Sequence, residues 1–183
     1  DAGRKLPLSE KFFIDGIGLA AASLSREELI RQIPEHVKAE VAGILEMDDE
    51  GLLNVLERRT FDYLWHEANP ANGLIRDRTM KGSPCSIAAV GFGLSAIPVA
   101  VERGWVTRDE GYARALATLK TFAGGGVEGQ RGFYYHFVDM AEGRRFGDSE
   151  ISSIDTTLFL AGALTSGQYF AGTEVEILAD KLF

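Results

Sequence analysis

The acidic residues that could support catalysis are concentrated in one short segment, residues 148–156. Glu150 lies in the approach to a predicted helix, and Asp155 lies in the first turn of that helix. Hydrolysis of a glycosidic bond needs two carboxyl groups, one to donate a proton and one to activate water or attack the sugar. Both side chains could point into a cavity at the helix start. Glu150 and Asp155 are therefore the candidate catalytic residues, with Asp148 beside them as a candidate substrate contact.

A structural role accounts for the same segment. Ser152 and Asp155 have the S-x-x-D spacing of a capping box, and an acidic side chain in a first turn also interacts favourably with the helix dipole. Helix caps are much commoner than catalytic acids. The spacing alone therefore favours a stabilising role for Asp155 over a catalytic one.

Two other segments supply candidate substrate contacts. Tyr135 and His136 lie in the aromatic run at 132–137, which could present stacking surfaces to sugar rings or pack as a hairpin on the core. For Phe133 and Phe137 we favour packing on the core. Asp77 and Arg78 follow a turn at 68–73 and could clamp sugar hydroxyls, or could form a local ion pair on a loop.

Helix signals dominate the elements that would position these residues. Capping pairs, Pro34 and apolar periodicity predict helices starting near residues 25, 34, 50, 86, 107, 154 and 173. Alternation at 133–138, with a turn at Glu142–Gly143 and a return through 144–146, predicts a β-hairpin.

Helices that are apolar all round alternate with helices that have a single apolar stripe. The segments 86–103 and 154–170 are of the first kind and should be the most buried, with 107–122 packed outside them. The alternation predicts an inner ring of helices wrapped by an outer ring, an α/α toroid; periodicity alone equally allows a four-helix bundle. The residues expected in the core are Ile87, Val90, Phe92, Leu94, Leu158, Leu160 and Leu164.

Composition excludes several classes of function. The net charge is −8, and no cluster of Lys and Arg is large enough for a phosphate-binding face, so no nucleic-acid partner is expected. Cys85 is the single cysteine and the three histidines are scattered, so neither a disulfide, a metal site nor a cofactor is expected.

No membrane span is expected either, because the apolar stretch 85–101 is short of the roughly 20 residues that a span needs. The stretch 12–24 follows Arg4–Lys5 and ends in small residues, which fits an export signal and a periplasmic or secreted protein. It fits an amphipathic N-terminal helix equally well, with a cytoplasmic location as the alternative.

Several blocks, in a consistent order, resemble the glycoamylase-like family of glycoside hydrolases. That family includes endo-β-1,2-glucanases and a domain of cyclic β-1,2-glucan synthases. The blocks are FDYLWHEANP (61–70), NGLIRDR (72–78), GSPCSIAAVGFG (82–93), VERGW (101–105), GFYYHF (132–137) and EISSIDT (150–156).

The resemblance implies an all-α fold, a partial α/α toroid of the incomplete (α/α)6-barrel type with a small β-hairpin insertion. Residues 49–183 would be the N-terminal part of the toroid domain, and residues 1–48 an extension. Asp155 would be a cleft acid with Glu150 and Asp148 as neighbours, acting on a β-linked glucan, with β-1,2-glucan the expected polymer. The second acid would lie in helices beyond Phe183, so the 183-residue chain alone is expected to be inactive. The alternative is a non-catalytic glucan-binding or structural module, as within a synthase.

Overall fold

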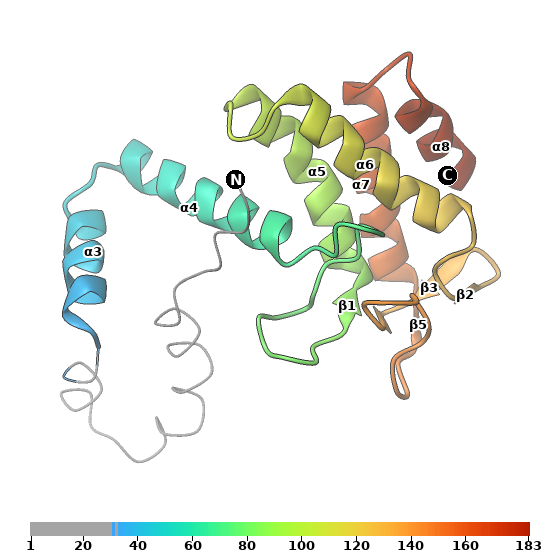
Figure 1. Cartoon of the computed structure of the whole chain (residues 1–183), viewed down its shortest axis with the longest axis horizontal. Coiled ribbons are helices and arrows are strands. Elements are labelled where there is room, and N and C mark those ends of the chain that lie inside the picture. Colours follow the sequence, from blue (N-terminus) through green and yellow to red (C-terminus); the bar gives the residue numbers. More distant parts are fainter. Residues whose placement is uncertain (1–30, 32) are drawn as a thin grey trace. The chain divides into compact units, whose positions relative to one another are not determined.

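The computed structural model describes residue 31 and residues 33–183 (Figure 1). The chain divides into two compact units, Asp1–Arg58 and Arg59–Phe183, and each is described by itself. The predicted helix near Ser25 and the signal-like stretch at 12–24 lie outside the described residues. The predicted domain boundary after residue 48 stays a prediction.

In the first unit, helix α3 (Glu35–Leu45) begins directly after Pro34, as predicted. Helix α4 (Asp49–His66) starts in this unit and ends in the second. None of the residues of α3 is buried, and the buried residues of α4, Phe61 and Leu64, both belong to its second half.

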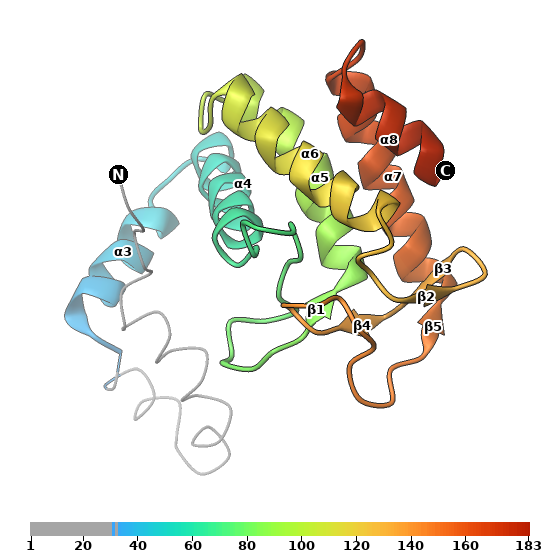
Figure 2. The ribbon, with the colours of Figure 1, turned by 45° about the vertical axis from the view of Figure 1, so that its right-hand side comes forward.

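Four helices form the body of the second unit: α5 (Ile87–Glu102), α6 (Arg108–Ala123), α7 (Ser153–Tyr169) and α8 (Glu174–Leu182). Helix α5 packs along α7, whereas α6 packs against α5 and α8, and α8 also packs against α7 (Figure 2). The paired helices α5 and α7 are thus covered by α6 and α8. The predicted inner and outer helices are confirmed.

Helix boundaries follow the capping residues. Ser86 caps α5 by accepting a hydrogen bond from the Ala89 N–H, and Thr107 and Glu110 form a complete capping box on α6. Each bond satisfies a backbone N–H that has no partner inside its helix. Among the described residues, no helix combines the length and apolar character that crossing a membrane requires.

Two glycines bring the backbones of α5 and α7 together. A Cβ added at Gly162 would lie 2.1 Å from the Gly91 carbonyl oxygen, and one added at Gly91 would lie 2.3 Å from that of Leu158. One turn further along α7, the Ser166 hydroxyl donates to the Leu94 carbonyl at 2.7 Å. The spacing of these helices is therefore set by main-chain contact rather than by side-chain size.

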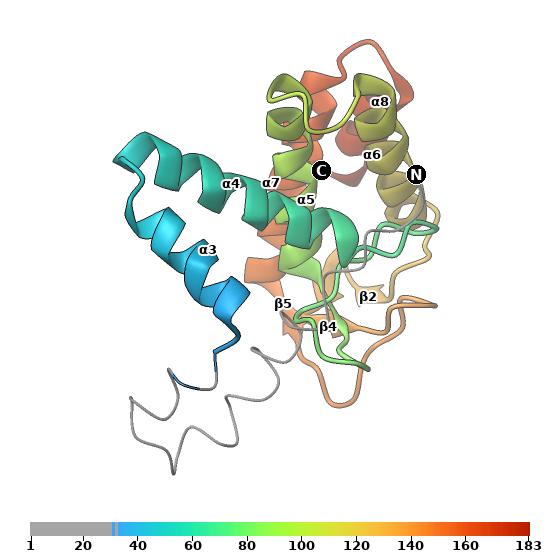
Figure 3. The same ribbon diagram turned by 60° about the vertical axis from the view of Figure 1, so that its left-hand side comes forward.

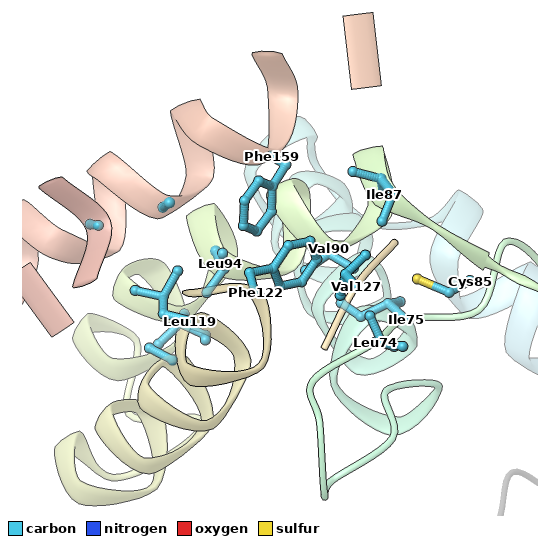
Figure 4. Close-up of a cluster of buried hydrophobic side chains, with 14 of the residues drawn as sticks. Leu74, Ile75, Cys85, Ile87, Val90, Leu94, Leu119, Phe122, Val127 and Phe159 are labelled. Atoms are coloured by element: carbon cyan, nitrogen blue, oxygen red, sulfur yellow. The ribbon is translucent and has the colours of Figure 1, made fainter. Parts of the chain in front are cut away.

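The core of the second unit lies between these helices and the loop at 74–75 (Figure 4). The rings of Phe122 and Phe159 stack with centroids 3.9 Å apart, and Tyr134 meets both edge-on. Fully buried aliphatic side chains surround this aromatic group, namely Leu74, Ile87, Val90, Leu94, Leu119 and Val138.

The core prediction is correct for three of its four residues on α5 and for none of its three residues on α7. Ile87, Val90 and Leu94 are buried, whereas Leu158, Leu160 and Leu164 are only partly buried. The prediction for Phe92 is wrong, because its side chain is 52% exposed. The large buried side chains of α5 recur at 87, 90, 94 and 97, which places position 92 on another face of the helix.

The strands are short and form two small sheets. Strand β1 (Cys85–Ser86) pairs antiparallel with β4 (Phe137–Val138), and β3 (Phe133–Tyr135) pairs with β2 (Gly129–Gln130) and β5 (Ile151–Ser152). The predicted hairpin is partly present as a bridge between Val138 and Arg145. The aromatic run is divided between two strands. Its first part, β3, pairs with β5, and its second part, β4, pairs with β1, with His136 between them.

Both inner helices begin directly from a strand. Strand β1 ends at Ser86 before α5, and β5 ends at Ser152 before α7, so the strands gather at the N-terminal ends of α5 and α7 (Figure 3). The Asn69 side chain donates to the Met140 carbonyl at 2.8 Å, and that of Asn72 donates to it at 3.1 Å. These bonds tie the turn at 69–73 to the loop that follows β4.

Candidate functional site

His136 lies where the two sheets meet, and its backbone joins the starts of both inner helices. Its N–H donates to the Glu150 carbonyl at 2.9 Å, and its carbonyl accepts from the N–H of Ile87, the first residue of α5, at 3.2 Å. The break in the aromatic strand thus places one histidine between the segments that lead into α5 and α7.

The imidazole ring lies between two carboxylates. Nδ1 is 3.0 Å from Glu150 Oε1, a hydrogen-bond distance, and Nε2 is 3.7 Å from Asp155 Oδ1. The second distance allows an ion pair but is too long for a hydrogen bond. The ring also stacks on Phe137, with centroids 3.7 Å apart and planes inclined by 20°.

Asp155 takes part in the cap of α7, although only one of the two backbone bonds of the predicted capping box is present. Its N–H donates to Ser152 Oγ at 3.1 Å, and the Ser152 hydroxyl donates back to Asp155 Oδ2. The side chain is 11% exposed, and its other oxygen, Oδ1, is the one nearest to His136. Capping therefore occupies one carboxylate oxygen and leaves the second facing the imidazole.

Glu150 is the more accessible acid, with 68% of its side chain exposed. A hydrogen bond from its own backbone N–H and a second from His136 lower the pKa of its carboxyl group. Glu150 is therefore ionised at neutral pH and acts only as a hydrogen-bond acceptor.

Tyr135 is positioned by its pairing with Ile151 and by Arg145. The Arg145 guanidinium lies 4.9 Å above the centre of the tyrosine ring, and its Nε donates to the Ser149 carbonyl at 2.6 Å. One face of Tyr135 is thus covered by a cation. Sequence reasoning missed Arg145, although its place in the predicted return of the hairpin was a usable signal.

Asp77 and Arg78 form a local ion pair, which was the predicted alternative to a clamp for sugar hydroxyls. Arg78 Nε donates to Asp77 Oδ2 at 2.8 Å, and a second guanidinium nitrogen lies 2.7 Å from the same oxygen. Within residues 33–183 their contacts join them to each other and to Ser83 and Pro84, and not to the acids near α7. Asp148 is exposed on the surface.

A small hollow lies elsewhere, lined by α4, α5, α6 and the loop at 73–75, and none of the candidate residues contributes to it. At its wall, the Arg114 guanidinium lies 4.1 Å above the Trp65 ring and donates to the Trp65 carbonyl at 3.1 Å. In the part of the chain that the structure describes, no group of three His, Cys, Asp or Glu side chains could hold a metal ion.

Comparison with known proteins places this geometry in context. No family model matches the chain. An exo-β-1,2-glucooligosaccharide sophorohydrolase from Parabacteroides distasonis is 33% identical over 130 residues, which is 68% of this chain and 18% of that protein.

Solved structures agree with this match. A glucoamylase candidate from Bacteroides uniformis has a TM-score of 0.67 and 25% identity, with 75% of this chain and 35% of that chain covered. The endo-β-1,2-glucanase from Chitinophaga pinensis, solved with sophorotriose and glucose, has a TM-score of 0.63 and 26% identity, with 74% and 35% covered.

The fold is therefore a partial α/α toroid of the glucoamylase-like class. Sequence and fold together show that the chain belongs to the glycoamylase-like family of glycoside hydrolases. The chain spans about a fifth of the length of the curated relative and about a third of these solved chains.

Proposed function

We propose that this protein hydrolyses β-linked glucans, with β-1,2-linked oligosaccharide or polysaccharide as the substrate class. The observation that carries the proposal is the cluster of Asp155, His136 and Glu150 at the start of inner helix α7. The sophorohydrolase from Parabacteroides distasonis and the glucanase from Chitinophaga pinensis are both named for β-1,2-glucans. A site of this kind needs acidic groups beside hydrogen-bonding groups, and the cluster supplies both.

In this proposal Asp155 transfers a proton to or from the reacting sugar. Its carboxylate is held by Ser152 through Oδ2, so that Oδ1 stays available beside His136. Glu150 is ionised and exposed, so it is suited to accept hydrogen bonds, as it does from His136, rather than to donate a proton. Tyr135, next to His136, is partly buried and remains the candidate contact for a sugar ring.

The substitution Asp155→Asn tests the proposal in the full-length protein. Asparagine keeps the size of the side chain and can still accept the Ser152 hydrogen bond, but it cannot carry the proton. We expect hydrolysis of β-1,2-glucan to fall by at least about 100-fold, the usual scale for a general acid or base, with little change in melting temperature.

Asp109→Asn is the matched control, because Asp109 is also an acid in the first turn of a capped helix, α6. We expect this variant to hydrolyse glucan at the parental rate. An Asp155→Asn variant that hydrolyses β-1,2-glucan at the parental rate would remove Asp155 from the site. A parent protein that binds the glucan without cleaving it would instead support a non-catalytic binding module.

A further inference from the structure

The two nitrogens of His136 face different acids, and the first of these contacts determines where the ring carries its proton. Glu150 is ionised and can only accept, so the 3.0 Å contact to Nδ1 requires a proton on Nδ1. The position of the proton on one ring nitrogen sets the role of the other. Nε2 is thus left to interact with Asp155.

Nε2 lies 3.7 Å from Asp155 Oδ1, within the range of an ion pair and beyond that of a hydrogen bond. With Nδ1 bonded to Glu150, the ring presents Nε2 to the oxygen of Asp155 that the Ser152 cap leaves open.

The surroundings favour a fixed ring. Phe137 covers one face of the imidazole, and the backbone of His136 is bonded at both its N–H and its carbonyl. The paired segment on β1 and α5, Cys85 to Ile87, carries no charged side chain, since burial raises the pKa of the Cys85 thiol to about 12. Among the residues that the structure describes, the ion pairs of the ring are those with Glu150 and Asp155.

We infer that His136 is a positioning residue: Glu150 fixes its tautomer and so holds Nε2 beside Asp155 Oδ1. Glu150 then acts on the reaction through His136. Part of the inference, the tautomer, is independent of catalysis; the effect on hydrolysis rests on the proposed function.

The tautomer is tested by long-range ¹H–¹⁵N spectra of the imidazole rings of the purified protein. The chain has three histidines, and the signals of His136 are those lost in His136→Gln. We expect the neutral His136 ring to carry its proton on Nδ1 in the parent. In Glu150→Ala this preference should disappear, and the ring should resemble those of the exposed His36 and His66. A parent ring protonated on Nε2, or a tautomer unchanged in Glu150→Ala, would overturn the inference.

Steady-state kinetics test the effect on hydrolysis. We expect His136→Gln and Glu150→Ala to lower kcat by about 10- to 100-fold, the scale of a displaced catalytic group, with KM nearly unchanged. The control is His66→Gln, on the exposed last turn of α4, which should match the parent. A raised KM with parental kcat would make His136 a substrate contact instead. If the parent cleaves no glucan, the proposed function fails, and the spectra still decide the tautomer.

Discussion

The contact between Gly91 and Gly162 makes a sharp stability prediction. In Gly162→Ala the new Cβ would lie 2.1 Å from the Gly91 carbonyl oxygen, whereas ordinary contact begins at 3.4 Å. The obstructing atoms are backbone, so no side-chain rotation can relieve the clash. The helices α5 and α7 must separate by roughly 1 Å at this point, which disturbs a close-packed interior.

The magnitude combines two opposing effects. Overpacking of this kind costs about 1–3 kcal/mol or more, while replacing glycine by alanine inside a helix returns about 1 kcal/mol. We expect a net loss of about 2 kcal/mol, which corresponds to a melting temperature lower by about 8 °C for a domain of this size. Thermal and urea unfolding would both measure it, with the slope of the urea transition unchanged.

Gly93→Ala is the matched control in the same helix, α5. The Cβ added there would lie 2.3 Å from Ile75 Cδ1, which is the far end of a flexible side chain, and 3.8 Å from the next nearest atom. A small rotation of Ile75 relieves this contact, so the change in stability should be below about 1 kcal/mol. Equal melting temperatures for the two variants would refute the argument that main-chain contact sets the helix spacing.

Two further predictions concern the cap of α7 and the buried thiol. Ser152→Ala should cost about 1 kcal/mol of stability and also lower glucan hydrolysis, because Ser152 holds the Asp155 carboxylate. The control, Thr107→Ala, removes the cap of α6 and should cost a similar amount of stability while leaving hydrolysis intact. Equal activity in the two variants would contradict a link between Ser152 and Asp155. Burial raises the pKa of Cys85 from 9.0 to about 12, so the native protein should not react with a thiol reagent at pH 8, and the unfolded chain should. As the pH rises, the thiol of the unfolded chain ionises before the thiol of the folded protein. The stability that Cys85 contributes is therefore complete below pH 9.0 and is lost as the pH rises towards about 12. Thermal unfolding of the parent and of Cys85→Ala across this pH range would measure the difference.

Local chemistry in the sequence predicted most of the helix boundaries. Ser86, Thr107 and Ser152 each begin a helix because their side chains satisfy backbone N–H groups that lie within three residues. Because these hydrogen bonds join residues close together in the sequence, they can be predicted without knowledge of the tertiary structure. The prediction for Phe92 was wrong because an apolar helix gives no indication of which of its faces meets another element.

The candidate site was predictable in its residues and not in its connections. Asp155, Glu150 and His136 were singled out, but His136 was expected to contact sugar rather than two carboxylates. That arrangement depends on strand pairing. The chain ends its pairing with β5 before His136 and begins its pairing with β1 after it, and both partner strands are distant in sequence. Asp77 and Arg78 pair with each other, as their adjacency in the chain allowed, and their role as a sugar clamp stays a prediction.

The bonds that hold the second unit together join residues far apart in the chain. The bond from Ser166 to Leu94 spans 72 residues, and that from Asn69 to Met140 spans 71. Closing such long loops costs chain entropy before any contact repays it, so folding should be slow for a helical domain of this size. During synthesis, α5 leaves the ribosome well before α7 does. The bond between Ser166 and Leu94 can therefore form only after translation has passed Ser166, which makes the packing of α7 on α5 a late step of folding.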